Sequence, residues 1–265
     1  MGAARYHRAD MSISAWNKMR HQIGYKLVGV GCRLAAIAGE YPITKPIEPS
    51  NLEVLGDRSF QSSVREVADL TLLDTARLAN LWSLCRMTDP KGNILEIGSY
   101  KGGGALHLSN CCPNRKVIAC DSFSGFETLD PSLDHNFKDH MFKDTRRESV
   151  EALFKSRGRD YDLLDGFFPA SSKGHTLAPV SFVHLDVDIY KATIESLHFL
   201  EEERILMDRS LIVLDDYQRR ADGVTEAVQE FTSAVEDWIS FPMFPGQCLL
   251  VRHTWFARGE IARKG

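Results

Sequence analysis

The sequence predicts an α/β fold built on a mostly parallel sheet, and three observations lead to this prediction. The chain has 265 residues, of which 43% are hydrophobic, which is enough for one sizeable core. Beyond Pro90, short and almost continuously apolar runs alternate with helix-length segments, as in parallel strands covered on both faces. A glycine-rich turn and several acidic residues follow these runs, where such folds bind ligands.

The first 50 residues are predicted to form a helical extension with a linker, and residues 51–265 the main domain. The apolar stretch Tyr25–Ala38 is too short to span a bilayer and contains Lys26 and Arg33. We expect it to pack against the domain or a second subunit, with a helix lying on a membrane as the alternative. Prolines 42, 46 and 49 favour an extended linker after it.

The elements of the main domain follow in order. Apolar residues at helical spacing predict a helix over Ser62–Arg86. Four apolar runs then predict buried strands: Asn93–Ile97, Lys116–Cys120, Ser181–Leu185 and Ser210–Leu214. Helical periodicity returns in Tyr190–Met207 and after Asp222. The runs Phe241–Phe244 and Gln247–Arg252, with Pro245-Gly246 between them, predict an antiparallel hairpin at the sheet edge.

Composition excludes several classes of partner. The net charge of −4 lacks the basic footprint of a nucleic-acid-binding protein. No signal peptide or membrane span is recognised, so we expect no stable membrane insertion. The six cysteines do not form a disulfide framework, and the adjacent Cys111 and Cys112 lack metal-ligand spacing. They predict reduced packing cysteines in a cytoplasmic protein.

The segment Ile94–Ala105 reads as a strand, a glycine-rich turn and a helix. The spacing of Glu96, Gly98 and Gly102 differs from the dinucleotide fingerprint. Glycines allow close approach of a ligand to the backbone, and the helix N-terminus favours a carboxylate or phosphate. An acid at the strand end suits a cationic group, such as the ammonium of a methionine moiety. The alternative is a tight turn with no ligand.

Asp121 ends the second apolar run, about twenty residues beyond the glycine turn, where a carboxylate accepts hydrogen bonds from ribose hydroxyls in related folds. The following Ser122–Gly125 is placed to wrap an adenine ring. An aspartate at a strand end is common, so this interpretation depends on its pairing with the glycine turn.

Four aspartates follow two neighbouring strands: Asp186, Asp188, Asp215 and Asp216. The carboxyl ends of parallel strands meet at one sheet edge, and clustered carboxylates repel one another unless a cation joins them. An all-oxygen set suits Mg²⁺, Mn²⁺ or Ca²⁺ better than Zn²⁺. The alternative is that one pair, such as Asp215-Asp216, only caps a helix.

Strand alternation suggests separate roles for these aspartates. Asp186, Asp215 and Asp216 would hold the ion, while Asp188 would face the substrate. A cation acidifies a hydroxyl that it contacts, and a nearby carboxylate then takes the proton as a sulfonium methyl arrives in line, about 3 Å from the oxygen.

These motifs resemble the macrocin O-methyltransferase family, the TylF/MycF/NovP group of class I S-adenosylmethionine-dependent methyltransferases, which methylates sugar hydroxyls of antibiotics. The resemblance covers Ser62–His253 and is carried by Leu95–Gly103, Asp121–Gly125, Leu185–Thr193 and Val213–Tyr217, with Ala221–Phe231 as a further likeness. It implies a Rossmann-like fold with a seven-stranded sheet, a saccharide or other small-molecule acceptor, and a homo-oligomer, dimeric or higher.

The resemblance also implies the site residues. Asp186, Asp215 and Asp216 would be ligands of Mg²⁺ (or Mn²⁺), and Asp188 the general base. The implied contacts with S-adenosylmethionine are Glu96, Gly98, Ser99, Lys101, Gly102, Gly103, Asp121, Ser122, Phe123, Gly166, Phe167 and Asp186. The chain departs from the family pattern at Phe126, at Gln218 and in Asp165–Pro169, where the match is loose; these departures concern the acceptor and the loop shapes.

Residues 127–146 form a long polar segment beside the predicted site, and such segments are often lids. His135 or His140 would position or deprotonate the substrate there, or be solvated loop histidines. His184, in a buried strand, is interpreted as a core histidine with satisfied hydrogen bonds rather than a ligand.

Three other functions fit parts of the pattern. Asp186-Val187-Asp188 also matches the D-x-D motif with which metal-dependent glycosyltransferases hold a nucleotide sugar, but that function leaves the glycine turn and Asp215-Asp216 unused. A non-catalytic binding protein would have an eroded site. A catechol or phenol O-methyltransferase would use a similar cation arrangement, and only its acceptors would distinguish it.

Overall fold

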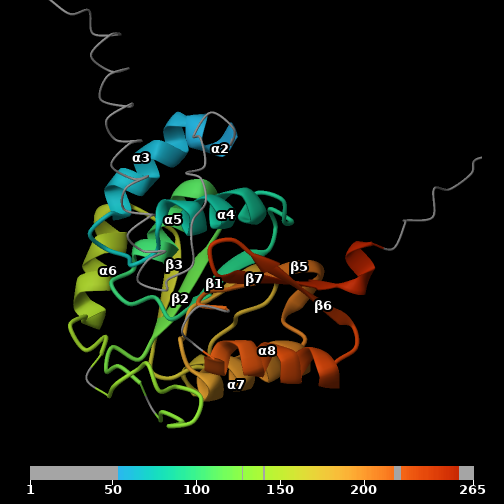
Figure 1. The fold of residues 1–265 in the computed structure, drawn as a ribbon. Helices are drawn as coiled ribbons and strands as arrows, with labels where there is room; N and C mark the ends of the chain where they lie inside the picture. Colours follow the sequence, from blue (N-terminus) through green and yellow to red (C-terminus); the bar gives the residue numbers. More distant parts are fainter. Residues whose placement is uncertain (1–52, 127, 140, 218–221, 257–265) are drawn as a thin grey trace, which may run out of the picture. The chain divides into compact units, whose positions relative to one another are not determined.

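The computed structural model describes residues 53–126, 128–139, 141–217 and 222–256. The predicted extension over residues 1–50 lies outside them. Seven strands form one sheet in the order β3-β2-β1-β4-β5-β7-β6 (Figure 1). The strands are β1 Asn93–Ile97, β2 Val117–Asp121, β3 Tyr161–Asp165, β4 Val180–Leu185, β5 Leu206–Leu214, β6 Trp238–Met243 and β7 Gln247–Arg252.

The pairings confirm the predicted fold class. Strands β1 to β5 pair in parallel, whereas β7 runs antiparallel to both β5 and β6. The last two strands form the predicted edge hairpin, whose turn contains Pro245 and Gly246. The sheet is therefore of the Rossmann-like type, mostly parallel with an antiparallel edge.

Helices cover both faces of the sheet (Figure 1). The α-helices are α2 Glu53–Gly56, α3 Arg58–Val67, α4 Thr75–Cys85, α5 Gly103–Cys111, α6 Arg147–Ser156, α7 Tyr190–Glu202 and α8 Asp222–Ala234, and short 3₁₀ turns are η2 Ala170–Ser172 and η3 His253–Trp255. One apolar cluster packs α7 and α8 on the sheet, and a second packs α3, α4, α5 and α6 on its other face. No helix in the described ranges is long and apolar enough to cross a membrane.

The single helix predicted over Ser62–Arg86 is wrong, because the structure has two helices, α3 and α4, in this region. Asp57 and Asp74 cap them, each accepting hydrogen bonds from two backbone N–H groups of the first turn. Apolar residues keep their helical spacing through the connection, at Leu70 and Leu73, so periodicity gave no sign of the break. The cap at Asp74 is the signal that identifies it.

Strand β3 was not predicted, and its composition explains why. Its sequence Tyr161–Asp165 contains two aspartates, Asp162 and Asp165, and only Leu164 is fully buried. It forms the edge of the sheet and pairs with β2 alone. An edge strand needs less apolar surface than the central strands, so it lacked the continuous apolar run used to find them.

The sheet register sets the position of the acidic residues. Ile97 lies opposite Leu185, and Leu185 lies opposite Leu214. The residues that follow these three, which include Asp186 and Asp215, therefore leave the sheet side by side at its carboxyl edge.

Candidate functional site

The glycine turn after β1 is shaped by its protein neighbours. Gly98 has a φ of +91°, and a Cβ there would lie 1.8 Å from the carbonyl oxygen of Asp186. A Cβ on Gly103 would lie 2.4 Å from the carbonyl oxygen of Leu70. These glycines allow close passage of backbone segments, so their first role is packing of the turn. Gly102, at φ +81°, is the N-cap of α5.

Glu96 points into the base of this turn. It is 1% exposed, and its Oε1 lies 2.9 Å from Nδ1 of His184. A Cβ on Gly104 would lie 2.2 Å from the same Oε1, so this glycine makes room for the carboxylate. Oε2 of Glu96 and Oγ of Ser99 are buried without a hydrogen-bond partner in the described part of the chain. Buried unsatisfied polar atoms are costly, and a ligand with an ammonium and a carboxylate would satisfy both.

Asp121 organises the next strand tip. Its carboxylate accepts hydrogen bonds from the backbone N–H groups of Tyr100 and Phe123, both at 2.7 Å. Burial raises the pKa of Asp121. Its carbonyl accepts from the N–H of Gly166 at 2.9 Å, which brings the segment after β3 beside it. Phe167 is 37% exposed and can contact a ligand.

Two residues predicted to bind the cofactor use their side chains within the protein. Ser122 Oγ donates to the carbonyl of Gly125 at 2.7 Å. Lys101 Nζ forms an ion pair with Asp144 at 2.7 Å. Hence the backbone, rather than the side chain, of these two residues is available to a ligand in this arrangement.

The four predicted aspartates lie together at the tips of β4 and β5. Oxygen atoms of Asp186, Asp188 and Asp216 lie within 4.8 Å of one another, and so do one ligand atom each of His184, Asp186 and Asp215. Asp186 belongs to both groups. The structure thus brings Asp188 into the same cluster as the three predicted metal ligands, where sequence alternation had separated it.

Within this acidic cluster, Asp186 and Asp188 are in an environment that is unfavourable for a negative charge. Burial raises the pKa of Asp186 and Asp188 well above the ordinary value, and the neighbouring carboxylates raise both further. Asp188 and Asp216 have φ values of +65° and +57°, in the left-handed region that non-glycine residues rarely adopt. Raised carboxylate pKa values together with backbone strain are typical of functional sites.

Asp215 is held by three donors that the sequence gave no reason to expect. Arg77 Nη1 lies 2.8 Å from Oδ1, and both His184 Nε2, at 2.8 Å, and Gln247 Nε2, at 2.9 Å, contact Oδ2. Burial alone would raise the pKa of Asp215, but His184 and Arg77 lower it below its ordinary value.

His184 joins the two parts of the site. Its ring nitrogens contact Glu96 and Asp215, so both are satisfied. Burial alone would lower its pKa, but the two carboxylates raise it to about 10. The buried sequence Glu96–His184–Asp215–Arg77 alternates negative and positive groups from the glycine turn to the acidic cluster. Arg77, in α4, was not predicted to be a site residue. The one signal in the sequence is an arginine placed on the apolar face of this helix.

The segment predicted to be a lid is anchored at two places. Asp134 is 2% exposed, and its Oδ1 accepts from the N–H of Tyr190 at 2.9 Å, at the start of α7. Asp144 accepts from the hydroxyl of Tyr100 at 2.7 Å, and Thr145 Oγ1 donates to the carbonyl of Tyr100 at 2.7 Å. His135 is exposed. His140 and Gln218 lie outside the described residues.

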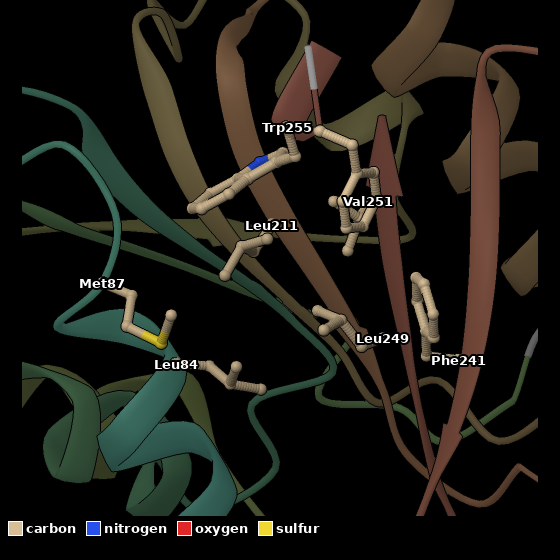
Figure 2. Close-up of a pocket in the computed structure, with 8 residues that line it drawn as sticks. Leu84, Met87, Leu211, Phe241, Leu249, Val251 and Trp255 are labelled. Atoms are coloured by element: carbon tan, nitrogen blue, oxygen red, sulfur yellow. The ribbon is translucent and has the colours of Figure 1, made fainter. Parts of the chain in front are cut away.

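An apolar cavity of about 280 Å³ lies elsewhere, between the end of α4 and the β6–β7 hairpin (Figure 2). Its lining residues are Leu84, Met87, Leu211, Phe241, Leu249, Val251, Trp255 and Phe256. None of them carries a charge, and none belongs to the predicted site. This cavity therefore lacks the groups that bind a charged cofactor.

Comparison with known families and structures agrees with the fold. A family model described as macrocin-O-methyltransferase (TylF) matches residues 57–244. The O-methyltransferase NovP has a similar structure, with a TM-score of 0.60 and 17% identity over 69% of this chain and 82% of NovP. CalS11, a calicheamicin methyltransferase, has a TM-score of 0.51 and 16% identity over 96% of this chain and 98% of its own.

A third similar structure is the S-adenosylhomocysteine-bound methyltransferase PaMTH1 from Podospora anserina. Its TM-score is 0.50, with 12% identity over 74% of this chain and 88% of that chain. A search of curated protein sequences found no match. At these identities the structural matches establish the fold, and the family model carries the assignment.

Proposed function

The chain belongs to the macrocin-O-methyltransferase (TylF) family and is an S-adenosylmethionine-dependent O-methyltransferase, and we propose that it methylates a hydroxyl of a sugar, a glycosylated metabolite or a polysaccharide with the help of Mg²⁺. The acidic cluster at the tips of β4 and β5 is the observation that carries the metal part of this proposal. The cytoplasmic location and the homo-oligomeric state predicted from the sequence are part of the same proposal.

The cofactor would occupy the tips of β1, β2 and β3. The unpartnered Oε2 of Glu96 and Oγ of Ser99 suit the ammonium and carboxylate of its methionine moiety. Asp121 would accept hydrogen bonds from the ribose, as an acid at this strand end does in related folds, and Gly166 and Phe167 would lie beside the adenine. S-adenosylmethionine supplies an electrophilic methyl group on a sulfonium.

Asp186, Asp215 and Asp216 are the proposed ligands of the divalent cation, which lowers the pKa of a hydroxyl that it contacts. Arg77, His184 and Gln247 fix the orientation of Asp215 through its two oxygens. Orienting partners of this kind commonly tune metal ligands. His184 and Arg77 offset part of the negative charge, which is consistent with a site for one divalent ion rather than two.

Asp188 is the proposed general base. Burial and the neighbouring Asp186 raise its pKa well above the ordinary value, and a base is most effective when its pKa is near the working pH. Once a cation offsets the neighbouring charges, Asp188 can accept the proton of the acceptor hydroxyl while the methyl group is transferred. Asp188 lies three residues beyond the end of β4 and has a φ of +65°.

An assay with purified enzyme tests this proposal. Radiolabelled S-adenosylmethionine is incubated with an acceptor panel of free sugars, glycosylated metabolites, polysaccharides and catechols, with Mg²⁺ or with EDTA. We expect methylation of a saccharide, lost with EDTA and restored by Mg²⁺ or Mn²⁺. Activity that is indifferent to EDTA would refute the requirement for a cation. Activity confined to catechols would refute the proposal that the acceptor is a saccharide. The glycosyltransferase alternative is not favoured, because the family model that matches residues 57–244 describes methyltransferases.

A further inference from the structure

Three cysteines come together on the α4–α5 side of the sheet, away from the acidic cluster. Cys85 ends α4, Cys111 ends α5, and Cys112 follows directly. The Sγ atoms of Cys85 and Cys112 are 3.6 Å apart, those of Cys111 and Cys112 are 3.8 Å apart, and all three lie within 4.8 Å of one another. The sequence showed only the adjacent pair, because Cys85 belongs to another helix.

These spacings match those of a tetrahedral thiolate site. Zinc binds thiolate sulfur at about 2.3 Å, so two sulfurs on one Zn²⁺ are about 3.8 Å apart. The three sulfurs thus form one face of a tetrahedron of suitable size. Cys111 and Cys112 are only half-buried, which leaves a solvent-facing side for a fourth ligand.

A buried cation lies beside two of the three sulfurs. Arg115 is 5% exposed, and its Nη1 lies 3.5 Å from Sγ of Cys85 and 3.9 Å from Sγ of Cys112. Its other hydrogen-bond partners in the described part of the chain are carbonyl and hydroxyl oxygens, the shortest contact being 2.6 Å to Oγ of Ser181. No carboxylate of the described ranges forms an ion pair with it. A buried guanidinium without a counter-ion is unfavourable.

We propose that Cys85, Cys111 and Cys112 form a binding site for a thiophilic divalent cation, Zn²⁺, with Arg115 as its charge partner. Binding releases three thiol protons and leaves a complex of three thiolates and Zn²⁺ with one net negative charge, which Arg115 neutralises.

The site would link the ends of two helices that support the active centre. Helix α4 carries Arg77, which contacts Asp215, and α5 follows the glycine turn. A metal at their ends would hold these helices together and raise the melting temperature. This proposal does not depend on the acceptor or on the role of the aspartates.

Co²⁺ titration of the full-length, reduced protein tests the site, with excess Mg²⁺ present to occupy the aspartates. Co²⁺ bound to thiolates gives a charge-transfer band that carboxylates do not produce. We expect the band to appear in the wild type, to saturate at one Co²⁺ per chain and to disappear on addition of Zn²⁺. Cys112→Ser and Cys111→Ser should abolish or strongly weaken it. Cys248→Ala, which changes a buried cysteine outside the cluster, should retain it.

A second measurement uses the wild-type protein, so it tests the proposal even if the variants fail to fold. Zn²⁺ should protect Cys111 and Cys112 from alkylation, as mapped by mass spectrometry. The proposal would be overturned by a wild type without the charge-transfer band, by a band that survives both substitutions, or by unchanged alkylation with Zn²⁺. A Cys85–Cys112 disulfide in air, combined with no metal uptake after reduction, would also overturn it.

Discussion

Single residues determine how the acidic cluster works, and Asp188 and Asp215 are in different environments. Asp215 accepts hydrogen bonds from three protein donors, and His184 and Arg77 keep its pKa low despite burial. Among the described residues Asp188 has no cationic partner of this kind, and burial and the neighbouring Asp186 raise its pKa well above the ordinary value. Carboxylates whose environments separate their pKa values commonly have different roles in catalysis. Asp215 is thus suited to holding an ion and Asp188 to receiving a proton.

Replacing Asp188 by Asn tests this division. The amide keeps the size of the side chain but cannot accept the proton, so turnover should fall by about 100-fold or more. Affinity for S-adenosylhomocysteine should stay within about threefold of the wild type, as measured by calorimetry, since the cofactor residues are unchanged. A variant with full activity would remove Asp188 from the role of base.

At the scale of the elements, close contact between strand tips depends on glycine. Gly98 and Gly158 both have positive φ, but a Cβ at Gly98 would lie 1.8 Å from the Asp186 carbonyl, whereas nothing lies within 4 Å at Gly158. Both positions therefore carry a backbone cost for alanine, and only Gly98 adds a clash. This makes them a matched pair for substitution.

Gly158→Ala should cost about 1–2 kcal/mol of stability, the usual cost of a left-handed alanine. Gly98→Ala should cost substantially more, or prevent folding, because backbone atoms of β1 and β4 would have to move apart. Urea denaturation of both variants measures the difference. Equal losses would show that the clash is relieved without displacing the Asp186 segment.

The elements with strong local signals could be predicted from the sequence alone. The central strands have continuous apolar runs, so β1 and β4 were found to within a residue, and the aspartates follow from the strand ends. Edge strand β3 and the break between α3 and α4 lack such signals, since one is half polar and the other is marked only by the cap at Asp74. The contacts of Asp215 with Arg77 and Gln247 join residues 138 and 32 positions apart, and no local pattern encodes them.

At the scale of the whole molecule, the site makes stability depend on pH. The raised pKa values of Asp186 and Asp188 mean that the folded protein keeps protons which the unfolded chain releases above the ordinary aspartate range. Stability therefore falls as pH rises through that region. The contribution of His184 has the same sign: it is complete below about pH 6.5 and is lost as pH rises through its folded pKa of about 10.

Mg²⁺ should reverse part of this pH dependence, because the cation replaces protons in the acidic cluster. We expect the rise in melting temperature caused by Mg²⁺ to be larger near pH 9 than near pH 6. Differential scanning fluorimetry at both pH values, with Asp186→Asn as the control, measures this effect. An equal rise at both pH values, or the same rise in the control, would argue against displacement of protons from these aspartates.

The most direct measurement for the whole account is a Mn²⁺ titration followed by electron paramagnetic resonance, with Zn²⁺ present to occupy the cysteines and S-adenosylhomocysteine to fill the cofactor site. We predict that the wild type binds one Mn²⁺ per chain and that Asp186→Asn/Asp216→Asn loses this binding while keeping S-adenosylhomocysteine. A wild type that binds no Mn²⁺, or a double variant that binds it equally well, would contradict the claim that neighbouring strand tips build a cation site beside the cofactor.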